Sequence, residues 1–420
     1  MPVLITYLIY SLGLYGWSLC SIQYDSAAPA IRYGAASLLL IVFVWWCSSG
    51  KKKQIHSVVV TVMGIFMNIA LSVAYGCTSD EAQVLHISDL KDTYAGQTVV
   101  AICVFIIVYG VTRYTRVYKM KLVNLVVALV TLVIAFGARI TGEKLGGSYL
   151  YFKGIMVFSF VLFCFPFISA NLIAEKEDAY VGKNVRNLSW NLFILLGYTC
   201  LLYMASVLNT EYGLVLILGA SMCVLFYLRC KNMVTKLFYT GICAAAGLTA
   251  MEFVSHIHDR VLLWIDPVTN ADTAGMKEKA EAVLYLFRYL KNMGYYGRGL
   301  NNLRSSRRIP TYRSDHVLLT IANDYSLLLV VLVILLSLLL VRQLLSCPKG
   351  VEVYDYFLNL SIALVVGFTI LINLGSVSGS FIQAGISFPW LSASGGQNNL
   401  MFTGLLAVHC GIVAKGGDTT

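Results

Sequence analysis

The sequence predicts an all-α, polytopic integral membrane protein. Of its 420 residues, 58% are hydrophobic and only 12% are charged, whereas a soluble globular chain is about 25% charged. The apolar residues gather in runs of about 20, the length at which a helix crosses the hydrocarbon core of a bilayer. The connections between the runs are rich in Lys and Arg. Together these three observations predict about 10 to 12 transmembrane helices.

The apolar runs predict the spans in chain order. They are residues 3–22, 34–49, 57–76, 98–113, 122–138, 154–174, 190–208, 212–229, 236–254, 317–341, 356–376 and 398–414. The spans divide the chain into an N-terminal part (1–254, about nine spans), a large polar loop (255–316) and a C-terminal part (317–420). Within the last part, the glycines and the proline near 377–397 predict a re-entrant segment, because irregular backbone at membrane depth is tolerated where it lines a cavity.

Charge in the short connections predicts the orientation. Sixteen Lys and Arg residues lie in the connections on one side of the membrane and five lie on the other. The positive-inside rule places the sixteen, with both termini, in the cytoplasm. The 255–316 loop then faces the outside, since long loops are translocated despite their charge. We therefore expect a multi-pass protein of a bacterial cytoplasmic membrane with an extracytoplasmic active face.

The formal net charge of +10 does not indicate nucleic-acid binding, because most of it lies in the short connections that set topology. The eleven cysteines form no CxxC pair and no metal-ligand spacing. Most lie in apolar runs, where a free thiol acts as a small apolar side chain. The N-terminus has no Lys or Arg before its first apolar run, which favours a first span over a cleaved signal.

The 255–316 loop is the candidate functional region. It holds ten basic and six acidic residues, and a basic loop at a membrane surface suits a substrate with an anionic head and an apolar tail. Inside it, residues 280–293 form an amphipathic helical pattern. Such a helix lies in the headgroup plane or packs on a small core of the loop itself.

Short motifs follow one another in a fixed order from 260 to 396. They are Arg260, Trp264-Ile265-Asp266-Pro267, Gly294-Tyr295-Tyr296-Gly297-Arg298-Gly299-Leu300, Ile309-Pro310, Ser314-Asp315-His316, Ile321-Ala322-Asn323-Asp324-Tyr325-Ser326-Leu327-Leu328, Asn373-Leu374-Gly375 and Gly385-Ile386-Ser387-Phe388-Pro389-Trp390-Leu391-Ser392-Ala393-Ser394-Gly395-Gly396. In this order the region 255–414 resembles the C-terminal half of the SEDS family (shape, elongation, division and sporulation; FtsW/RodA/SpoVE-like), of which the chain is a divergent member.

The N-terminal part resembles the family only faintly. Ile168 and Asn171 stand where the family has the Glu and Lys of a Pro-Ser-Glu-x-x-Lys-Leu segment. The family has seven spans before its large loop, so the nine candidates here imply two additional N-terminal spans or two misassigned ones.

The resemblance implies a peptidoglycan glycosyltransferase. Such an enzyme polymerises lipid II, an undecaprenyl-pyrophosphoryl disaccharide-peptide, into glycan strands for cell division or elongation. Asp315 stands at the position of the family's essential Asp and is the predicted general base, with its pKa raised by partial burial. Without the resemblance, an Asp that precedes a helix is more often an N-cap or a partner of the helix dipole.

Several further residues are candidates for substrate binding. A departing pyrophosphate needs delocalised positive charge, which Arg supplies in a fork geometry. Motif position favours Arg260 and Arg298, whereas Arg307, Arg308 and Arg313 suit plain attraction to lipid headgroups equally well. Asp324 binds substrate or pairs a neighbouring helix. Ser392 and Gly395 in the last motif complete the set, and Glu211 and Glu252 are possible partners of the loop arginines.

No cofactor is identified, although His256, His258 and Asp259 make a divalent cation possible; a surface role is the alternative. The resemblance implies a class B penicillin-binding transpeptidase and other division or elongation membrane proteins as partners. Two other functions stay open: a non-catalytic scaffold that recruits a transpeptidase, and a flippase or transporter of a lipid-linked precursor, for which the sequence offers no internal repeat.

Overall fold

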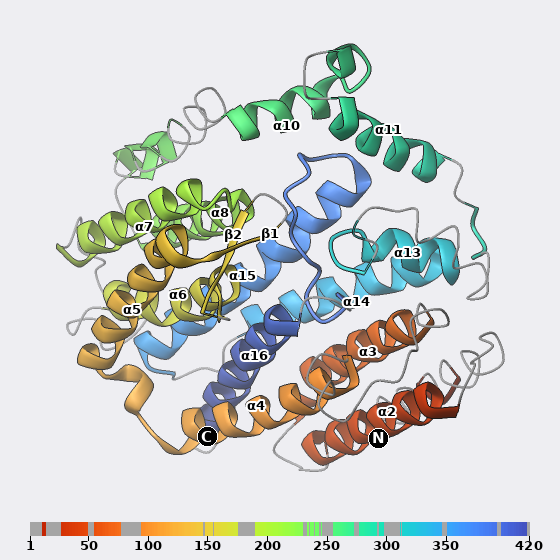
Figure 1. The fold of residues 1–420 in the computed structure, drawn as a ribbon. Helices are drawn as coiled ribbons and strands as arrows, with labels where there is room; N and C mark the ends of the chain where they lie inside the picture. The colour runs from red at the N-terminus through yellow and green to blue at the C-terminus, as the bar shows by residue number, and fades with distance from the viewer. Residues whose placement is uncertain are drawn as a thin grey trace.

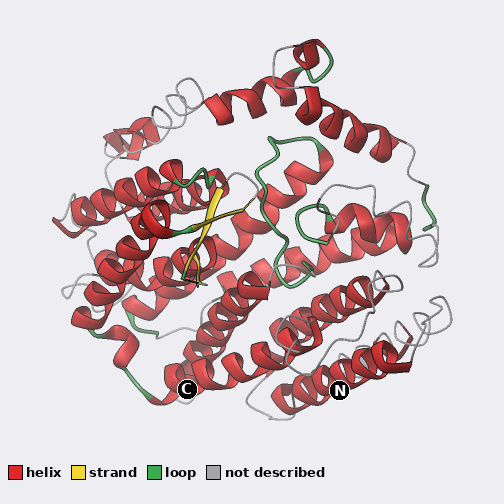
Figure 2. Cartoon of the chain, in the orientation of Figure 1, coloured by secondary structure: helices red, strands yellow, loops and turns green. Residues whose placement is uncertain are grey.

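The structure is a computed structural model that describes residues 11–13, 27–48, 54–76, 94–145, 148–153, 155–174, 190–229, 233–234, 236–238, 240–242, 245, 255–272, 277–291, 294–297, 311, 313–346, 351–392 and 396–417. Over these residues the chain is a bundle of long helices with two shorter helices lying across one end (Figure 1). Among the described residues helix dominates, and the strands form one small sheet (Figure 2).

Among the described residues, seven helices are long and apolar enough to cross a membrane. They are α2 (Ala27–Ser48), α4 (Tyr94–Tyr114), α5 (Lys121–Thr141), α7 (Trp190–Leu208), α8 (Tyr212–Arg229), α14 (Leu327–Leu345) and α15 (Val353–Ser378). Shorter apolar stretches lie in α3 (Gln54–Gly76) and α6 (Val157–Ile173), and α16 (Gly396–Gly417) packs along α4. This confirms the predicted α-helical, multi-pass membrane fold. Most of the predicted spans 3–22 and 236–254 falls outside the described residues.

The faces of α5 show why such a helix belongs in a membrane. Leu122, Leu125, Leu129 and Val133 are exposed along one side, at a spacing of three to four residues that forms a single stripe. The other side buries residues such as Ala135 against α6 and α7. An apolar outer stripe is stable only in lipid, because water penalises exposed hydrocarbon.

The run 317–341, expected as one continuous span, is two helices, so that prediction was wrong. Helix α13 (Val317–Asp324) ends at Tyr325, and α14 begins after Ser326, whose hydroxyl accepts a hydrogen bond from Leu329 N (3.1 Å). The loop segment 294–297 satisfies the backbone freed by the break. Gly297 N donates to Tyr325 O (3.0 Å), and Leu327 N donates to Tyr295 O (3.2 Å). Hydropathy cannot detect this break because both halves are apolar.

A second difference is a small antiparallel sheet between α5 and α6, where no strand was expected. Its strands are β1 (Glu143–Leu145), β2 (Ser148–Phe152) and β3 (Ile155–Met156), in the order β1-β2-β3. Phe152 lies against Gly137 of α5, where a Cβ atom would come within 2.8 Å of its ring. The sheet therefore closes the connection between two spans without changing the fold class.

Helices α10 (Ser255–Ile265) and α11 (Lys277–Lys291), joined in part by the 3-10 turn η3 (Thr269–Asp272), cover one end of the bundle (Figure 1). Buried Leu263 packs against Ala280 and Val283, and Leu286 packs against Leu319 of α13. Of the two interpretations of the amphipathic segment, the structure shows packing against neighbouring helices.

At the N-terminal end of α15, charged side chains are in direct contact. Lys119, in the turn η2 (Val117–Lys119), lies 2.8 Å from a carboxylate oxygen of Glu352 and 2.5 Å from one of Asp355. Tyr118 Oη donates a hydrogen bond to Asp355 Oδ1 (3.0 Å), and Lys415 Nζ donates to Tyr118 Oη (3.2 Å). This cluster fastens the α4–α5 connection to α15 and α16.

Candidate active site beneath α10 and α11

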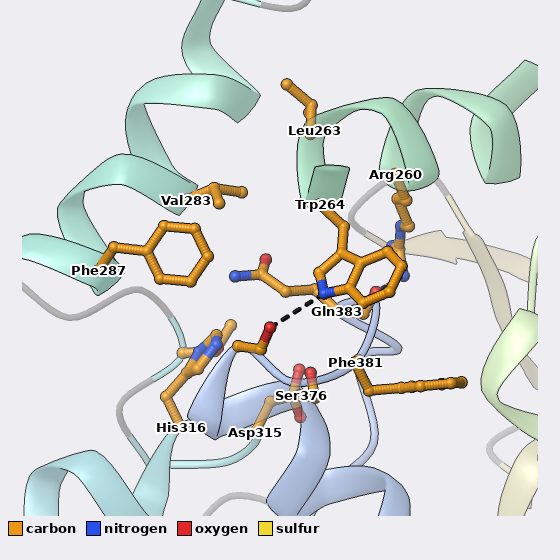
Figure 3. Close-up of a pocket in the computed structure, with 13 residues that line it drawn as sticks. Arg260, Leu263, Trp264, Val283, Phe287, Asp315, His316, Ser376, Phe381 and Gln383 are labelled. Carbon is orange, nitrogen blue, oxygen red and sulfur yellow. Dashed lines mark hydrogen bonds between the residues drawn. The ribbon is translucent and has the colours of Figure 1, made fainter. Parts of the chain in front are cut away.

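A cavity of about 290 Å³ lies between the two covering helices and the end of the bundle (Figure 3). Its walls come from α10, α11, the turn before α13, the end of α15 and the irregular segment 379–392 that follows it. The lining residues are Arg260, Leu263, Trp264, Val283, Phe287, Thr311, Asp315, His316, Ser376, Gly379, Phe381, Gln383 and Gly385. Segments more than 100 residues apart in sequence, such as α10 and 379–385, thus meet around one space.

Asp315 lies in a tight turn that faces this cavity. Thr311 begins the turn with a φ of 50°, and its carbonyl oxygen accepts hydrogen bonds from Ser314 N (2.9 Å) and His316 N (3.3 Å). From α15, Asn373 Nδ2 donates to Asp315 O (2.9 Å) and to Ile386 O (2.5 Å). The Asn373 amide therefore ties the turn to the 379–392 segment and holds the carboxylate in place.

The Asp315 carboxylate is partly buried and has hydroxyl neighbours. Ser387 Oγ donates to Asp315 Oδ1 (3.2 Å), and a Cβ atom on Gly385 would lie 3.8 Å from Oδ2. Burial raises the pKa of Asp315 above its ordinary value, although His316, the Ser387 and Ser314 hydroxyls and Arg260 lower it. A carboxyl group with a raised pKa in a cleft is suited to accept a proton near neutral pH.

Helix α10 contributes a cation and an aromatic wall. One Arg260 guanidinium nitrogen donates to Gln383 O (2.7 Å), and Trp264 Nε1 donates to Gly379 O (2.9 Å; dashed in Figure 3). These bonds hold α10 against the 379–392 segment. With Phe287 and Phe381, Trp264 forms an apolar wall facing the polar floor at Asp315. Such a cavity can accept a molecule with both apolar and charged parts.

Left-handed backbone is concentrated around the cavity. Of the six described residues with positive φ, Thr311, Gly379 and Gly385 line the cavity, and Trp390 lies in the 379–392 segment. Trp390 is fully buried, and its carbonyl oxygen accepts a hydrogen bond from Tyr94 Oη (2.9 Å). A bulky residue in this conformation is strained and persists only where the surroundings impose it, which is typical of functional sites.

Three of the other predicted binding residues are described by the structure, and none of the three lines this cavity. Arg313 lies in the Asp315 turn but does not line the cavity, and its carbonyl oxygen accepts a hydrogen bond from Ser392 Oγ (3.4 Å). Ser392 is fully buried. Asp324 lies at the far end of α13, buried, where Asn323 Nδ2 donates to its Oδ1 (2.7 Å). Both roles predicted for Asp324, binding substrate and pairing a neighbouring helix, stay predictions.

Arg298, Arg307, Arg308, Gly395 and Glu252 lie outside the described residues, as does the side chain of His256. Their predicted roles therefore stay predictions. Among the described residues there is no group of three side chains suited to hold a metal ion. On α6, Ile168 is buried in the bundle core, consistent with an apolar role for that position.

Sequence reasoning missed Gln383 and the aromatic wall. The Gln383 carbonyl oxygen accepts a hydrogen bond from the Arg260 guanidinium. The Gln383 side-chain amide points into the cavity between α11 and Asp315 (Figure 3). No motif marks this position. Glu211, in the turn between α7 and α8, interacts electrostatically with both Arg260 and Asp315, and burial raises its pKa to about 7. Its position beside a predicted span was the only sequence signal.

Fold and site together define a polytopic membrane protein with a carboxylate-containing cavity covered by two amphipathic helices. The chain belongs to the FTSW_RODA_SPOVE family of cell cycle proteins, whose family model matches residues 52–415. Helix α2 precedes the matched region.

Known relatives are peptidoglycan glycosyltransferases by name. The chain is 24% identical over 322 residues to peptidoglycan glycosyltransferase RodA of Mycobacterium leprae (strain TN), covering 74% of this chain and 67% of that protein. It is 24% identical over 190 residues to the RodA of Mycobacterium bovis (strain ATCC BAA-935 / AF2122/97), covering 45% of this chain and 39% of that protein. Among solved structures, a chain from a peptidoglycan synthase complex is similar with a TM-score of 0.62 and 15% identity, covering 85% of this chain and 97% of that one. This structural likeness supports the fold.

Proposed function

We propose that this chain is a membrane glycosyltransferase that polymerises lipid II into peptidoglycan glycan strands, with Asp315 as the general base. The observation that carries the proposal is the position of Asp315. It is a partly buried carboxylate with a raised pKa, it faces a cavity, and Arg260 and an apolar wall lie around it. Family membership and relatives named as peptidoglycan glycosyltransferases support the same reaction.

The proposed reaction proceeds by inversion at one sugar carbon. Asp315 accepts the proton of an acceptor sugar hydroxyl, and that oxygen forms a bond to C1 of the donor sugar. The bond from C1 to the lipid pyrophosphate breaks, and the pyrophosphate leaves with the electron pair. Arg260 stabilises the negative charge that develops on it, because a guanidinium forms paired hydrogen bonds to phosphate oxygens.

The cavity lining suits such substrates. Trp264, Phe287 and Phe381 offer flat apolar faces, which suit the apolar faces of sugar rings or the first units of the lipid chain. The charge distribution of the chain supports an extracytoplasmic location for this end of the bundle, with the 255–316 loop outside a bacterial cytoplasmic membrane. A class B penicillin-binding transpeptidase is the partner we expect, since a synthase complex has a chain of this fold.

The experiment is a polymerisation assay with purified protein and lipid II, resolved on a gel. Wild type should form glycan polymer, and Asp315→Asn should reduce the rate by about 10²–10⁴-fold, the usual contribution of a general base. Glu281→Gln is the matched control, because Glu281 is an exposed carboxylate on α11 outside the cavity. Polymer formed by Asp315→Asn at the wild-type rate would exclude the proposed role. Absence of polymer from wild type, with and without a transpeptidase, would favour a scaffold.

A further inference from the structure

The turn between α7 and α8 is held rigidly and ends in a carboxylate. Thr210 adopts a φ of 62°, and Glu211 N donates back to Ser206 O (2.8 Å). Buried Asn209 donates its Nδ2 to Ala135 O (2.7 Å) on α5. A β-branched residue in the left-handed region costs free energy, so the surrounding contacts impose this conformation. They determine where Glu211 lies.

The segment 383–386 packs against the start of α8, just after the Glu211 turn. A Cβ atom on Gly213, two residues after Glu211, would lie 2.7 Å from Ile386 Cγ1 and 3.1 Å from Ala384 O. The same segment accepts the Arg260 hydrogen bond at Gln383 O, and a Cβ atom on Gly385 would lie 3.8 Å from Asp315 Oδ2. The short irregular segment 383–386 therefore lies near the Glu211 turn, Arg260 and Asp315.

Arg260 consequently lies in the field of two carboxyl groups. Glu211 and Asp315 both attract its guanidinium, and the two carboxyls repel each other. Tyr212 at the start of α8 is the other titratable group that interacts with Arg260, and the neighbouring His316 acts on Asp315. Asp315 Oδ1 accepts a hydrogen bond from the Ser387 hydroxyl (3.2 Å). Arg260 is held instead by a backbone carbonyl.

We propose that Glu211 is a positioning residue for Arg260: its carboxylate balances the pull of Asp315 and keeps the guanidinium at Gln383 O, where a leaving pyrophosphate meets it. This inference rests on the proposed glycosyltransferase function. Without the Glu211 charge, Arg260 is drawn toward Asp315 alone. A closer Arg260 lowers the proton affinity of the Asp315 carboxylate and leaves less positive charge for the leaving group.

The sign of the pH effect follows from the two carboxyls. Burial raises the pKa of Glu211 to about 7, so wild type carries the Glu211 charge above that pH and loses it below. Glu211→Gln mimics the protonated form at every pH. Wild type and this variant should therefore have similar activity at low pH and diverge above about pH 7. The acid limb of the pH profile, which reports Asp315, should coincide in the two proteins where wild-type Glu211 is protonated, and the rate of the variant above about pH 7 should be lower.

The test is the pH dependence of kcat/KM for lipid II polymerisation by the purified full chain in wild type, Glu211→Gln, Glu211→Asp and the Glu281→Gln control. At about pH 8 we expect Glu211→Gln to lose about tenfold in kcat/KM, and the loss to disappear below about pH 6. Glu211→Asp keeps the charge on a shorter arm and should recover part of the rate above about pH 7. Glu281→Gln should follow the wild-type curve.

Three outcomes would overturn the inference. Glu211→Gln matches wild type at every pH; or its loss is equal at every pH, as expected of a purely structural defect; or Glu211→Asp does not restore any of the rate above about pH 7. Should Glu211→Gln fail to fold, as judged by size-exclusion profile, the pH profile of Glu211→Asp decides alone. A failure of the proposed function is seen differently, as absence of polymer from wild type or normal polymer from Asp315→Asn.

Discussion

The carboxylates near the two ends of α15 have different partners. At its first residues, Lys119 contacts Glu352 and Asp355 directly. At its last residues, about 39 Å away at 1.5 Å per helical residue, Asp315 has a hydroxyl partner and Arg260 is bonded to a backbone carbonyl. Lys119 lowers the pKa of Glu352, whereas burial raises the pKa of Asp315.

The difference separates a structural cluster from a reactive one. A carboxylate in contact with a Lys is stabilised in its charged form and is a poor proton acceptor. A carboxylate held near a cation but not paired with it keeps its basicity and leaves the cation available for a substrate. The backbone differs as well, because left-handed residues gather at the Asp315 end.

The largest expected effect is a contrast between two Asp→Asn variants. Asp315→Asn should lose polymerisation by about 10²–10⁴-fold without a fall in melting temperature. Asp355→Asn should keep its rate per folded molecule but lose about 1–3 kcal/mol of stability, because it weakens a buried hydrogen-bonded charge. Activity and thermal unfolding measured on the same preparations check both. The comparison fails if Asp355→Asn loses activity without losing stability.

A backbone contact at the cavity end gives the next effect. A Cβ atom on Gly297 would lie 2.1 Å from Tyr325 O, so Gly297→Ala should detach the loop from the break between α13 and α14. We expect a cost of about 1–3 kcal/mol, as for overpacking, together with a reduced rate. Gly110→Ala is the matched control, since its Cβ meets nothing within 4 Å. Equal thermal stability of the two variants would contradict this contact.

The pH dependence of stability should separate the two ends. The folded-state pKa of Asp315 is raised, so the folded state binds more protons there and stability falls as pH rises through that pKa. The folded-state pKa of Glu352 is lowered, so its contribution is present above the unfolded pKa and is lost on acidification. Relative to wild type, Asp315→Asn should therefore gain stability at higher pH, whereas Glu352→Gln should lose it there. Thermal unfolding at several pH values measures both, and identical pH dependence in the two variants would argue against the contrast.

The smallest effect concerns the wall of the cavity. Trp264→Phe keeps an aromatic face but removes the hydrogen bond from Nε1 to Gly379 O. We expect a loss of about 1 kcal/mol, seen as a rise in KM of several-fold with little change in kcat. Trp264→Ala, which also removes the ring, should raise KM further. A larger KM for Trp264→Phe than for Trp264→Ala would show that the ring does not contribute to the wall.

Much of the fold was predictable because hydropathy is a local property. The runs 190–208 and 212–229 coincide with α7 and α8. The break at Tyr325 and Ser326 was not predictable, since it depends on Tyr295 and Gly297 supplying hydrogen bonds from a distant loop. Neither half of that contact has a distinctive composition.

The candidate site was predictable where motifs carried it. Asp315 and Arg260 were singled out in sequence and line one cavity. Gln383 and Ser387 were not assigned roles, because a backbone carbonyl and a single hydroxyl acquire theirs only from what packs beside them. Ser392 was assigned a binding role from its motif, but it is buried beneath the Asp315 turn.

By itself the sequence determined that this chain crosses a membrane as helices, because the free energy of burying each span in lipid depends on that span alone. It also marked the carboxylate and the arginine through their motif order. Only the tertiary structure decided that Arg260 donates its hydrogen bond to Gln383 O rather than to Asp315. It also decided that Glu211 lies close enough to interact electrostatically with both Arg260 and Asp315. Electrostatic interactions depend on distance and burial, and both are set by packing between segments far apart in the chain.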